Sequence, residues 1–375
     1  MKEKICLVVS SAMTVNAFLQ QPIRRLSKSY DVYMVLNLGA GESLQGLENL
    51  VTVLPVAIER KIAPWRDLLA LGKIIILFRR HRFKLVHSVT PKAGLLAMLA
   101  SSISGVGIRI HTFTGQVWVT RHGIARWVLK SVDKLIALLG TYALVDSPSQ
   151  RQFLLDEGVL RASKSGVLAQ GSISGVDTTR FCPDAEARRR IREELKIAED
   201  ETTFLFLGRL NHDKGVLDLA AAFAGMQDER AHLLVVGPDE EIIASQMAKL
   251  TERCGGKVHF VGFASKPEQY MAAADVLCLP SYREGFGNVV IEAAAVGIPA
   301  IGSRIYGVVD AIQENCSGLL FEAHDVAGLQ AAMMAIANNK ELRLQLGRQA
   351  RERAISIFAS EKLAAAWLEL YRERV

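Results

Sequence analysis

Short apolar runs alternate with longer amphipathic stretches along the whole chain. Runs such as Ile5–Ser10 and Val276–Leu279 are rich in aliphatic residues and have the length of buried strands. Stretches such as 64–82 and 123–138 repeat apolar residues at the spacing of a helix. Alternation of this kind is typical of parallel sheets whose strands are connected by helices. The pattern therefore predicts an α/β fold.

The expected elements form two series. Strands are expected in the first half at Ile5–Ser10, Val32–Leu36, Val51–Leu54, Leu85–His87, Ile108–Phe113, Ala143–Val145 and Gly166–Ala169, with helices at about 15–28, 64–82, 91–104, 123–138 and 148–157. In the second half the strands are expected at Thr203–Gly208, Leu233–Gly237, Val258–Val261, Val276–Leu279, Ala300–Ile301 and Gly318–Phe321, with helices at about 215–226, 239–254, 266–274, 288–296, 308–314, 326–338 and 340–356.

A polar stretch, SGVDTTRFCPDAEARRR, separates the two series. It combines turn residues, a proline and a run of charges, so we interpret it as a linker. The length of 375 residues also agrees with two domains. We expect two doubly wound, Rossmann-like domains, residues 1–174 and residues 178–357. Because such sheets bind ligands beyond the carboxyl ends of their strands, the site is expected in a central cleft that both domains face.

Composition narrows the class of protein. The five cysteines include no Cys-x-x-Cys pair, which favours reduced thiols in a cytosolic protein and no metal site. No apolar run approaches the ~20 residues that a membrane-spanning helix needs. The N-terminal KICLVVSSA reads as a strand and not as a signal peptide. A Rossmann dehydrogenase is disfavoured because no Gly-x-Gly-x-x-Gly follows the first strand.

The segment SYREGFGNVVIE carries two glutamates, Glu284 and Glu292, eight positions apart. A Gly-Phe-Gly elbow after Glu284 leads into an apolar run, so a helix is expected to begin at Asn288, a good N-cap residue. A helix N-terminus offers free N–H groups and partial positive charge, which suit a phosphate. Two carboxylates beside such a site can accept hydrogen bonds from the hydroxyls of a sugar and of a ribose. The segment indicates a nucleotide-sugar pocket.

A second motif, GRLNHDKG, leaves the first strand of the second half and enters a helix. Its two cations, Arg209 and Lys214, are five residues apart and can face one diphosphate. Departure of a nucleoside diphosphate needs its charge neutralised by a divalent metal or by fixed cations and helix dipoles. The chain has no Asp-x-Asp pair to hold a metal. The route without a metal is therefore favoured.

With EGFGNVVIE, GRLNHDKG, SGVDTTRF and the tail SIFASEKLAAAWLELY, the chain resembles a retaining glycosyltransferase of family 4 (glycosyltransferase group 1) with the GT-B architecture. The resemblance implies sugar transfer from a nucleotide diphosphate donor with the anomeric configuration kept. It implies that Glu284 touches the donor sugar, Glu292 the ribose, and Arg209 and Lys214 the diphosphate. The donor-binding segment by this resemblance is Glu284, Gly285, Phe286, Gly287, Asn288, Val289 and Glu292. Gly175 and Asp177 would mark the hinge, and a final helix at about 358–371, within residues 358–375, would pack back on the first domain.

The first domain holds HTFTGQVW, which places His111 at the end of an expected strand. The resemblance implies that this histidine contacts the donor sugar and supports charge at the anomeric carbon. The alternative is a histidine that caps the strand. His87, in HSVTPKAG, is interpreted as structural. In the first loop, Ser10, Ser11 and Thr14 stand where many family members have a glycine pair, so their role stays open.

Charge is divided unevenly between the two halves. Residues 1–177 hold 22 Lys and Arg against 11 Asp and Glu, whereas residues 178–375 hold 23 against 28. Basic residues gather on expected helices, at Arg24, Arg25, Lys28, the segment 78–84, Arg121, Arg126, Lys130 and Lys134, with Trp127 among them. Interleaved basic and aromatic residues suit an anionic bilayer surface. No nucleic-acid fold signature accompanies them.

These observations predict a retaining, metal-independent glycosyltransferase that needs no cofactor. It would move a hexose or N-acetylhexosamine from a UDP-sugar to a saccharide on polyprenyl diphosphate, in the synthesis of O-antigen or capsule. This substrate class is implied because HSVTPKAG and HTFTGQVW resemble segments of bacterial enzymes that build such chains on polyprenyl diphosphate. We expect a cytoplasmic protein, peripheral on the inner face of the plasma membrane. The alternatives are a sugar-nucleotide epimerase, a soluble glucan or disaccharide synthase, or a non-catalytic sugar-nucleotide-binding protein.

Overall fold

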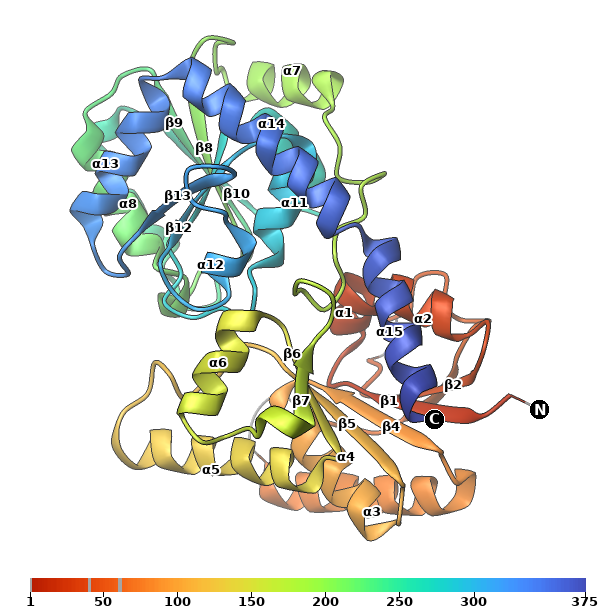
Figure 1. Ribbon diagram of the computed structural model, residues 1–375. Helices are drawn as coiled ribbons and strands as arrows, with labels where there is room; N and C mark the ends of the chain where they lie inside the picture. The colour runs from red at the N-terminus through yellow and green to blue at the C-terminus, as the bar shows by residue number, and fades with distance from the viewer. Residues whose placement is uncertain (1, 40–41, 60–62) are drawn as a thin grey trace. The chain divides into compact units, whose positions relative to one another are not determined.

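The computed structural model describes residues 2–39, 42–59 and 63–375 (Figure 1). The chain divides into two compact units. The first unit contains Met1–Ser174 and Ser360–Val375, and the second contains Gly175–Ala359. The chain thus passes between the units twice, and the N–H of Val176 donates to the carbonyl of Phe358 beside these passages. No helix among the described residues is long and apolar enough to cross a bilayer.

The first unit is a parallel sheet in the order β3-β2-β1-β4-β5-β6-β7. Its strands are β1 (Lys4–Val8), β2 (Asp31–Leu36), β3 (Thr52–Pro55), β4 (Leu85–Val89), β5 (Ile108–Phe113), β6 (Tyr142–Val145) and β7 (Ser165–Val167). Its helices are α1 (Ala12–Thr14), the π-helix η1 (Val15–Leu19), α2 (Gln20–Leu26), α3 (Pro64–His81), α4 (Pro91–Ile103), α5 (Gly123–Leu139), α6 (Pro148–Asp156), the 3₁₀-helix η2 (Ala162–Lys164) and α15 (Ser360–Arg374).

Two apolar cores cover the two faces of this sheet. One core packs residues of α3, α4 and α5 against one face, and Figure 1 shows α3, α4 and α5 side by side. The other core joins α2 and α15 to the opposite face. Trp367 and Tyr371 of α15 are fully buried there, and the indole of Trp367 donates to the carbonyl of Ile173 at 3.0 Å. The C-terminal helix is therefore part of the first core.

The second unit is also a parallel sheet, in the order β10-β9-β8-β11-β12-β13. Its strands are β8 (Thr202–Leu207), β9 (Ala231–Val236), β10 (Val258–Gly262), β11 (Val276–Leu279), β12 (Ala300–Ser303) and β13 (Gly318–Phe321). Its helices are α7 (Ala185–Glu194), η3 (His212–Lys214), α8 (Val216–Met226), α9 (Ala244–Leu250), η4 (Glu252–Cys254), α10 (Pro267–Ala273), α11 (Asn288–Val296), α12 (Val308–Ala311), α13 (Val326–Ala337) and α14 (Lys340–Ile357).

Helices α8, α9 and α13 cover one face of the second sheet, and α10, α11 and α14 cover the other. Both units are thus doubly wound parallel sheets, which confirms the predicted fold class. In each sheet the strand order reverses once, between β1 and β4 and between β8 and β11. Loops from two such strands leave in opposite directions and open a crevice between them. This reversal locates the candidate site.

Two segments differ in part from the predicted elements. The stretch interpreted as a linker ends in α7, whose first turn is capped by Asp184 accepting from the N–H of Ala187 at 2.9 Å. The helix expected at 239–254 begins only at Ala244, because Asp239 bonds the N–H groups of Ile243 and Ala244 and holds the preceding residues in a loop. Polar and charged residues dominate both segments, so apolar periodicity describes them poorly.

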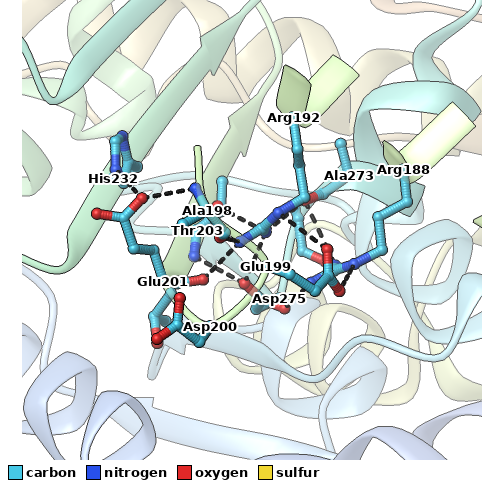
Figure 2. Close-up of polar contacts among 12 residues, drawn as sticks. Arg188, Arg192, Ala198, Glu199, Asp200, Glu201, Thr203, His232, Ala273 and Asp275 are labelled. Carbon is cyan, nitrogen blue, oxygen red and sulfur yellow. Dashed lines mark hydrogen bonds and ion pairs between the residues drawn. The ribbon is translucent and has the colours of Figure 1, made fainter. Parts of the chain in front are cut away.

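A buried arginine fixes α7 to the second sheet. Figure 2 shows Arg188 and Arg192 reaching from α7 toward Asp275, the residue before β11. The Arg192 guanidinium, only 2% exposed, donates to Thr203, to the carbonyl of Ala273 and to Asp275. Asp275 also accepts the backbone N–H of Thr203 at 2.8 Å. One carboxylate therefore links the helix to two strands.

Replacing Asp275 by alanine should lower the free energy of unfolding of the second unit by about 3 kcal/mol, because it leaves a buried guanidinium without its carboxylate. Glu199→Ala is the matched control: Glu199 also pairs with Arg188, but its side chain is 73% exposed against 13% for Asp275. An exposed pair contributes about 0–1 kcal/mol. Urea unfolding of both variants measures the difference. Equal losses would contradict the central role of Asp275.

Candidate active site

The two sequence motifs of the second unit meet where its strand order reverses. GRLNHDKG follows β8, and Ser281–Glu284 follow β11, the neighbouring strand across the reversal. Both motifs therefore lie at the carboxyl edge of the same sheet, where doubly wound folds bind ligands. The geometry brings together side chains that lie about 70 positions apart in the sequence.

Glycines allow the loops at this edge to touch. Gly215 has φ +62°, and a Cβ there would lie 2.0 Å from the carbonyl oxygen of Pro280. Gly307 has φ +83°, and its Cβ would lie 2.5 Å from the carbonyl oxygen of Gly285. Both positions combine a left-handed backbone with a contact that a side chain would block. The loops after β8, β11 and β12 are thereby held against one another.

Lys214 and Glu284 form an ion pair at this edge. The Lys214 Nζ lies 2.5 Å from Glu284 Oε1, and both side chains are mostly buried. The hydroxyl of Ser281, itself fully buried, donates to the same oxygen at 2.9 Å. Glu284 therefore has one oxygen held by two donors. The sequence predicted the cation and the carboxylate but not Ser281, although it lies in the same motif.

Arg209 is also paired with a carboxylate. Its Nη1 donates to Glu240 Oε2 at 2.7 Å, and the amide of Asn211 reaches the same oxygen at 3.4 Å. Glu240 comes from the loop after β9, which runs beside the loop after β8. Among the described residues, no contact joins Arg209 to the Lys214–Glu284 pair. Glu240 was missed because nothing in the sequence links the loop after β9 to GRLNHDKG.

Helix α11 begins beside Glu284, as predicted, but Asn288 is not its N-cap. The cap is Gly287, with φ +84°, and no side chain caps the first turn. The elbow is required because only glycine adopts this backbone freely. Phe286 is buried and packs against Phe358 with ring centroids 5.2 Å apart, so its side chain faces the core. Gly285, Phe286 and Gly287 therefore present mainly backbone at this edge, whereas Asn288 and Val289 are partly exposed.

Glu292 lies on α11 and is half-buried. Burial raises the pKa of its carboxyl group to about 7; Glu268 adds to this rise and Arg180 opposes it. Among the described residues, no hydrogen bond or ion pair engages its carboxylate. A desolvated carboxylate without a partner is a poor contributor to stability and is typical of a functional site.

Neighbouring pairs brace the loop that carries Glu284. Arg283 donates to Asp213 at 2.6 Å, and the N–H of Tyr282 donates to the carbonyl of Asp213 at 2.9 Å. The Tyr282 hydroxyl donates to Asp218 at 2.7 Å, and burial together with this carboxylate raises its pKa. These contacts tie the loop after β11 to the loop and helix after β8. They fix the loop and offer no group to a reaction.

In the first unit, His111 lies inside β5 and not at its end. Its ring is 2% exposed, and its Nδ1 lies 2.9 Å from the hydroxyl of Ser88. Burial lowers the pKa of His111 to about 3, so the ring is neutral. A Cβ on Gly94 would lie 2.3 Å from the ring, so α4 covers it closely. The predicted contact with a sugar stays a prediction, and the ring offers little surface for it here.

His87 is structural, as interpreted. Its two ring nitrogens lie 2.7 Å from the hydroxyls of Tyr371 and Thr112, and its ring stacks on Trp367. It thus joins β4, β5 and α15. In the first loop, Ser11 caps α1 and contacts Thr14. Thr90, with φ +78°, donates to Ser10 at 3.3 Å, so the reversal between β1 and β4 is lined with hydroxyls.

Comparison with known protein families identifies the second unit. Residues 187–353 match the family model described as "Glycosyl transferases group 1". These residues are a group 1 glycosyltransferase domain. The matched range contains Arg209, Lys214, Glu284 and Glu292.

Relatives extend this similarity over the whole chain. The chain is 29% identical over 350 residues to the capsular polysaccharide biosynthesis glycosyltransferase CapM of Staphylococcus aureus, covering 92% of this chain and 89% of that protein. It is 22% identical over 322 residues to the UDP-Gal:alpha-D-GlcNAc-diphosphoundecaprenol alpha-1,3-galactosyltransferase of Escherichia coli, covering 84% and 82%. In fold it matches the sucrose-phosphate synthase of Thermosynechococcus elongatus, with a TM-score of 0.85, 23% identity and 99% of each chain covered. The chain has the GT-B fold, and its second unit contains the group 1 glycosyltransferase domain.

The raised pKa of Glu292 makes the stability of the glycosyltransferase domain depend on pH. Between the unfolded value, 4.5, and the folded value, about 7, the folded state binds the extra proton, so stability falls as pH rises through this window. Glu292→Gln should remove this loss and melt at a higher temperature than wild type at pH 8. At pH 5 the two should melt alike. The exposed Glu229→Gln is the control, and an equal offset at both pH values would show that Glu292 does not titrate there.

Proposed function

We propose that the chain is a retaining glycosyltransferase that moves a hexose or N-acetylhexosamine from a UDP-sugar to a saccharide carried on polyprenyl diphosphate. The observation that carries the proposal is the Lys214–Glu284 pair at the strand reversal of the second unit. In this pair the Lys214 ammonium can bind a phosphate, and the neighbouring Glu284 carboxylate can accept a hydrogen bond from a sugar hydroxyl. Both lie close to the N-terminus of α11, which no side chain caps. The glycosyltransferase domain supplies the class of reaction.

The donor diphosphate would bind by exchange of partners. Arg209 and Lys214 each hold a carboxylate that a diphosphate, with its higher charge, can replace. The exposed Arg209–Glu240 pair is weak, so the exchange costs little. Lys214 then contacts the phosphate while Glu284, still bonded to Ser281, accepts a hydroxyl of the sugar. The partner-free Glu292 would accept the hydroxyls of the ribose.

The reaction can proceed on these fixed charges. As the bond from the anomeric carbon to the phosphate oxygen breaks, Arg209, Lys214 and the N-terminus of α11 stabilise the charge on the leaving diphosphate. The acceptor oxygen forms its bond to the anomeric carbon on the same face. Its proton passes to the leaving phosphate oxygen, so no separate base is required. We therefore propose catalysis without a divalent metal, in agreement with the absence of Asp-x-Asp from the sequence.

The acceptor is proposed from the relatives. One of them acts in capsular polysaccharide biosynthesis, and another uses a UDP-sugar and a diphosphoundecaprenol-linked saccharide. A comparable acceptor here places the enzyme at the inner face of the plasma membrane, in O-antigen or capsule synthesis. The alternative is a soluble synthase, which the fold of sucrose-phosphate synthase also accommodates. Transfer to a lipid-linked but not to a free sugar acceptor separates these two functions.

Transfer should be measured with UDP-sugars and a polyprenyl diphosphate-linked acceptor, in the presence of excess EDTA. We expect turnover to persist, and Arg209→Ala or Lys214→Ala to lower kcat/KM by roughly 10²–10³, as for loss of a charge contact in the transition state. The exposed Lys249→Ala, on α9, is the control. Activity lost with EDTA and restored by magnesium or manganese would exclude the mechanism. Near wild-type kinetics in either variant would remove that residue from the site.

The two glutamates should separate in binding experiments. Glu292→Ala should weaken the binding of UDP, because it removes the acceptor for the ribose hydroxyls. Glu284→Ala should leave UDP binding nearly unchanged but impair use of the UDP-sugar, because its proposed contact is to the sugar. Titration calorimetry with UDP alone measures the first effect, and kcat/KM measures the second. Equal weakening of UDP binding in both variants would show that the roles are misassigned.

A further inference from the structure

Large apolar side chains gather on one helical layer of the first unit. Of nineteen that are exposed among the described residues, ten lie on α3, α4 and α5. These three helices pack side by side on one face of the sheet (Figure 1). The middle helix, α4, is largely buried, so the exposed groups belong mainly to α3 and α5.

Each outer helix presents these groups as a stripe. The α3 stripe consists of Trp65, Leu68, Leu69 and Ile76, and the α5 stripe consists of Ile124, Trp127, Val128, Leu135 and Leu138. Their spacing of three and four residues puts each set on one side of its helix. Both helices already bury an opposite face, with Ile74 and Phe78 on α3 and Ile136 on α5. The stripes are therefore additional to the core.

In the part of the chain that the structure describes, the exposed charges on this layer that have no ion-pair partner are positive. The acidic residues of α3 and α5 are Asp67, which pairs with Lys92, and Asp133, which is buried and accepts from the indole of Trp118. Arg126 and Lys130 were among the basic residues predicted to suit an anionic bilayer, but both form ion pairs with Glu157. Among the described residues, no ion pair engages Lys73, Arg79, Arg80 or Lys134. The stripes are thus flanked by cations free to meet an anionic surface.

We infer that the α3–α5 layer docks on an anionic bilayer, with both stripes in the interface and these cations at the lipid headgroups. Apolar stripes with Trp and flanking Lys and Arg are what an interfacial helix requires. The negative charge of the headgroups attracts Lys and Arg side chains that lie near the surface. A second copy of the chain is a poorer occupant, because the same face on two copies would oppose positive charges. The inference rests on the proposed function only in that a lipid-linked acceptor lies in such a bilayer.

The tryptophans supply a direct readout. The chain has four, and Trp118 and Trp367 are buried whereas Trp65 and Trp127 are 82% and 70% exposed. Adding vesicles of phosphatidylethanolamine and phosphatidylglycerol should shift the tryptophan emission of the full chain to shorter wavelength. Pure phosphatidylcholine vesicles should shift it much less. Trp65→Phe/Trp127→Phe should abolish the shift, because the remaining indoles are in the cores.

Co-sedimentation with the same anionic vesicles tests the surface. Trp65→Ser/Trp127→Ser should weaken binding by about tenfold or more, and Lys73→Glu/Arg80→Glu/Lys134→Glu should weaken it most at low salt. The matched control is Phe263→Ser/Leu344→Ser, which removes apolar groups of 74% and 51% exposure from the second unit. UDP binding by calorimetry, measured without lipid, should be unchanged in every variant. This measurement tests the donor site separately. The proposed donor site can therefore be wrong while the membrane-docking inference is correct.

Three results would overturn the inference. The serine variant could co-sediment as well as wild type, or wild type could bind neither kind of vesicle. Wild type could also form a dimer in solution that the serine variant loses, without binding vesicles, and the layer would then be an interface between copies. Circular dichroism checks that each variant is folded. We expect every variant to fold, because all the substituted side chains are exposed.

Discussion

The site depends on close contact between the backbones of three loops, which is possible only where a residue has no Cβ. Gly215 and Gly307 let the loops after β8 and β12 rest against Pro280 and Gly285 in the segment after β11. Lys214 precedes one of these contacts and Glu284 precedes another, so the distance between the two charges is set by the backbone. A larger residue at either glycine would move the loops apart by more than a hydrogen bond tolerates. The chemistry of the site is thus supported by residues that have no side chain.

Much of the fold follows from apolar periodicity alone. Every expected strand is present, because buried parallel strands are short apolar runs, and among the described residues each strand except β2 precedes a helix. Apolar periodicity does not reveal contacts that attach an element through charged side chains. Helix α7 is attached by Arg188 and Arg192, and a buried arginine looks in a sequence like any exposed one. Its partner Asp275 is some eighty positions away, so no local pattern reveals the pair.

For the site, the sequence predicted the residues but not their partners. The motifs gave the residue types, and the sheet order places them at one edge. What the sequence could not give is how each charge is already satisfied. Glu240 comes from a neighbouring strand, and Ser281 acts on Glu284 through a loop whose path depends on distant glycines. For His111 the expected strand and β5 have the same bounds, and what the sequence could not show is that Ser88 and α4 bury its ring.

The order of the chain has a consequence for synthesis on the ribosome. The second unit, Gly175–Ala359, is one continuous segment, so it can close its core as soon as it emerges. The first unit begins earlier but needs Ser360–Val375, because Trp367 and Tyr371 fill the core against α2 and His87. Domains usually fold from the N-terminus during translation. Here the unit that is made first is completed last, because its α2 face stays uncovered until Ser360–Val375 have been made.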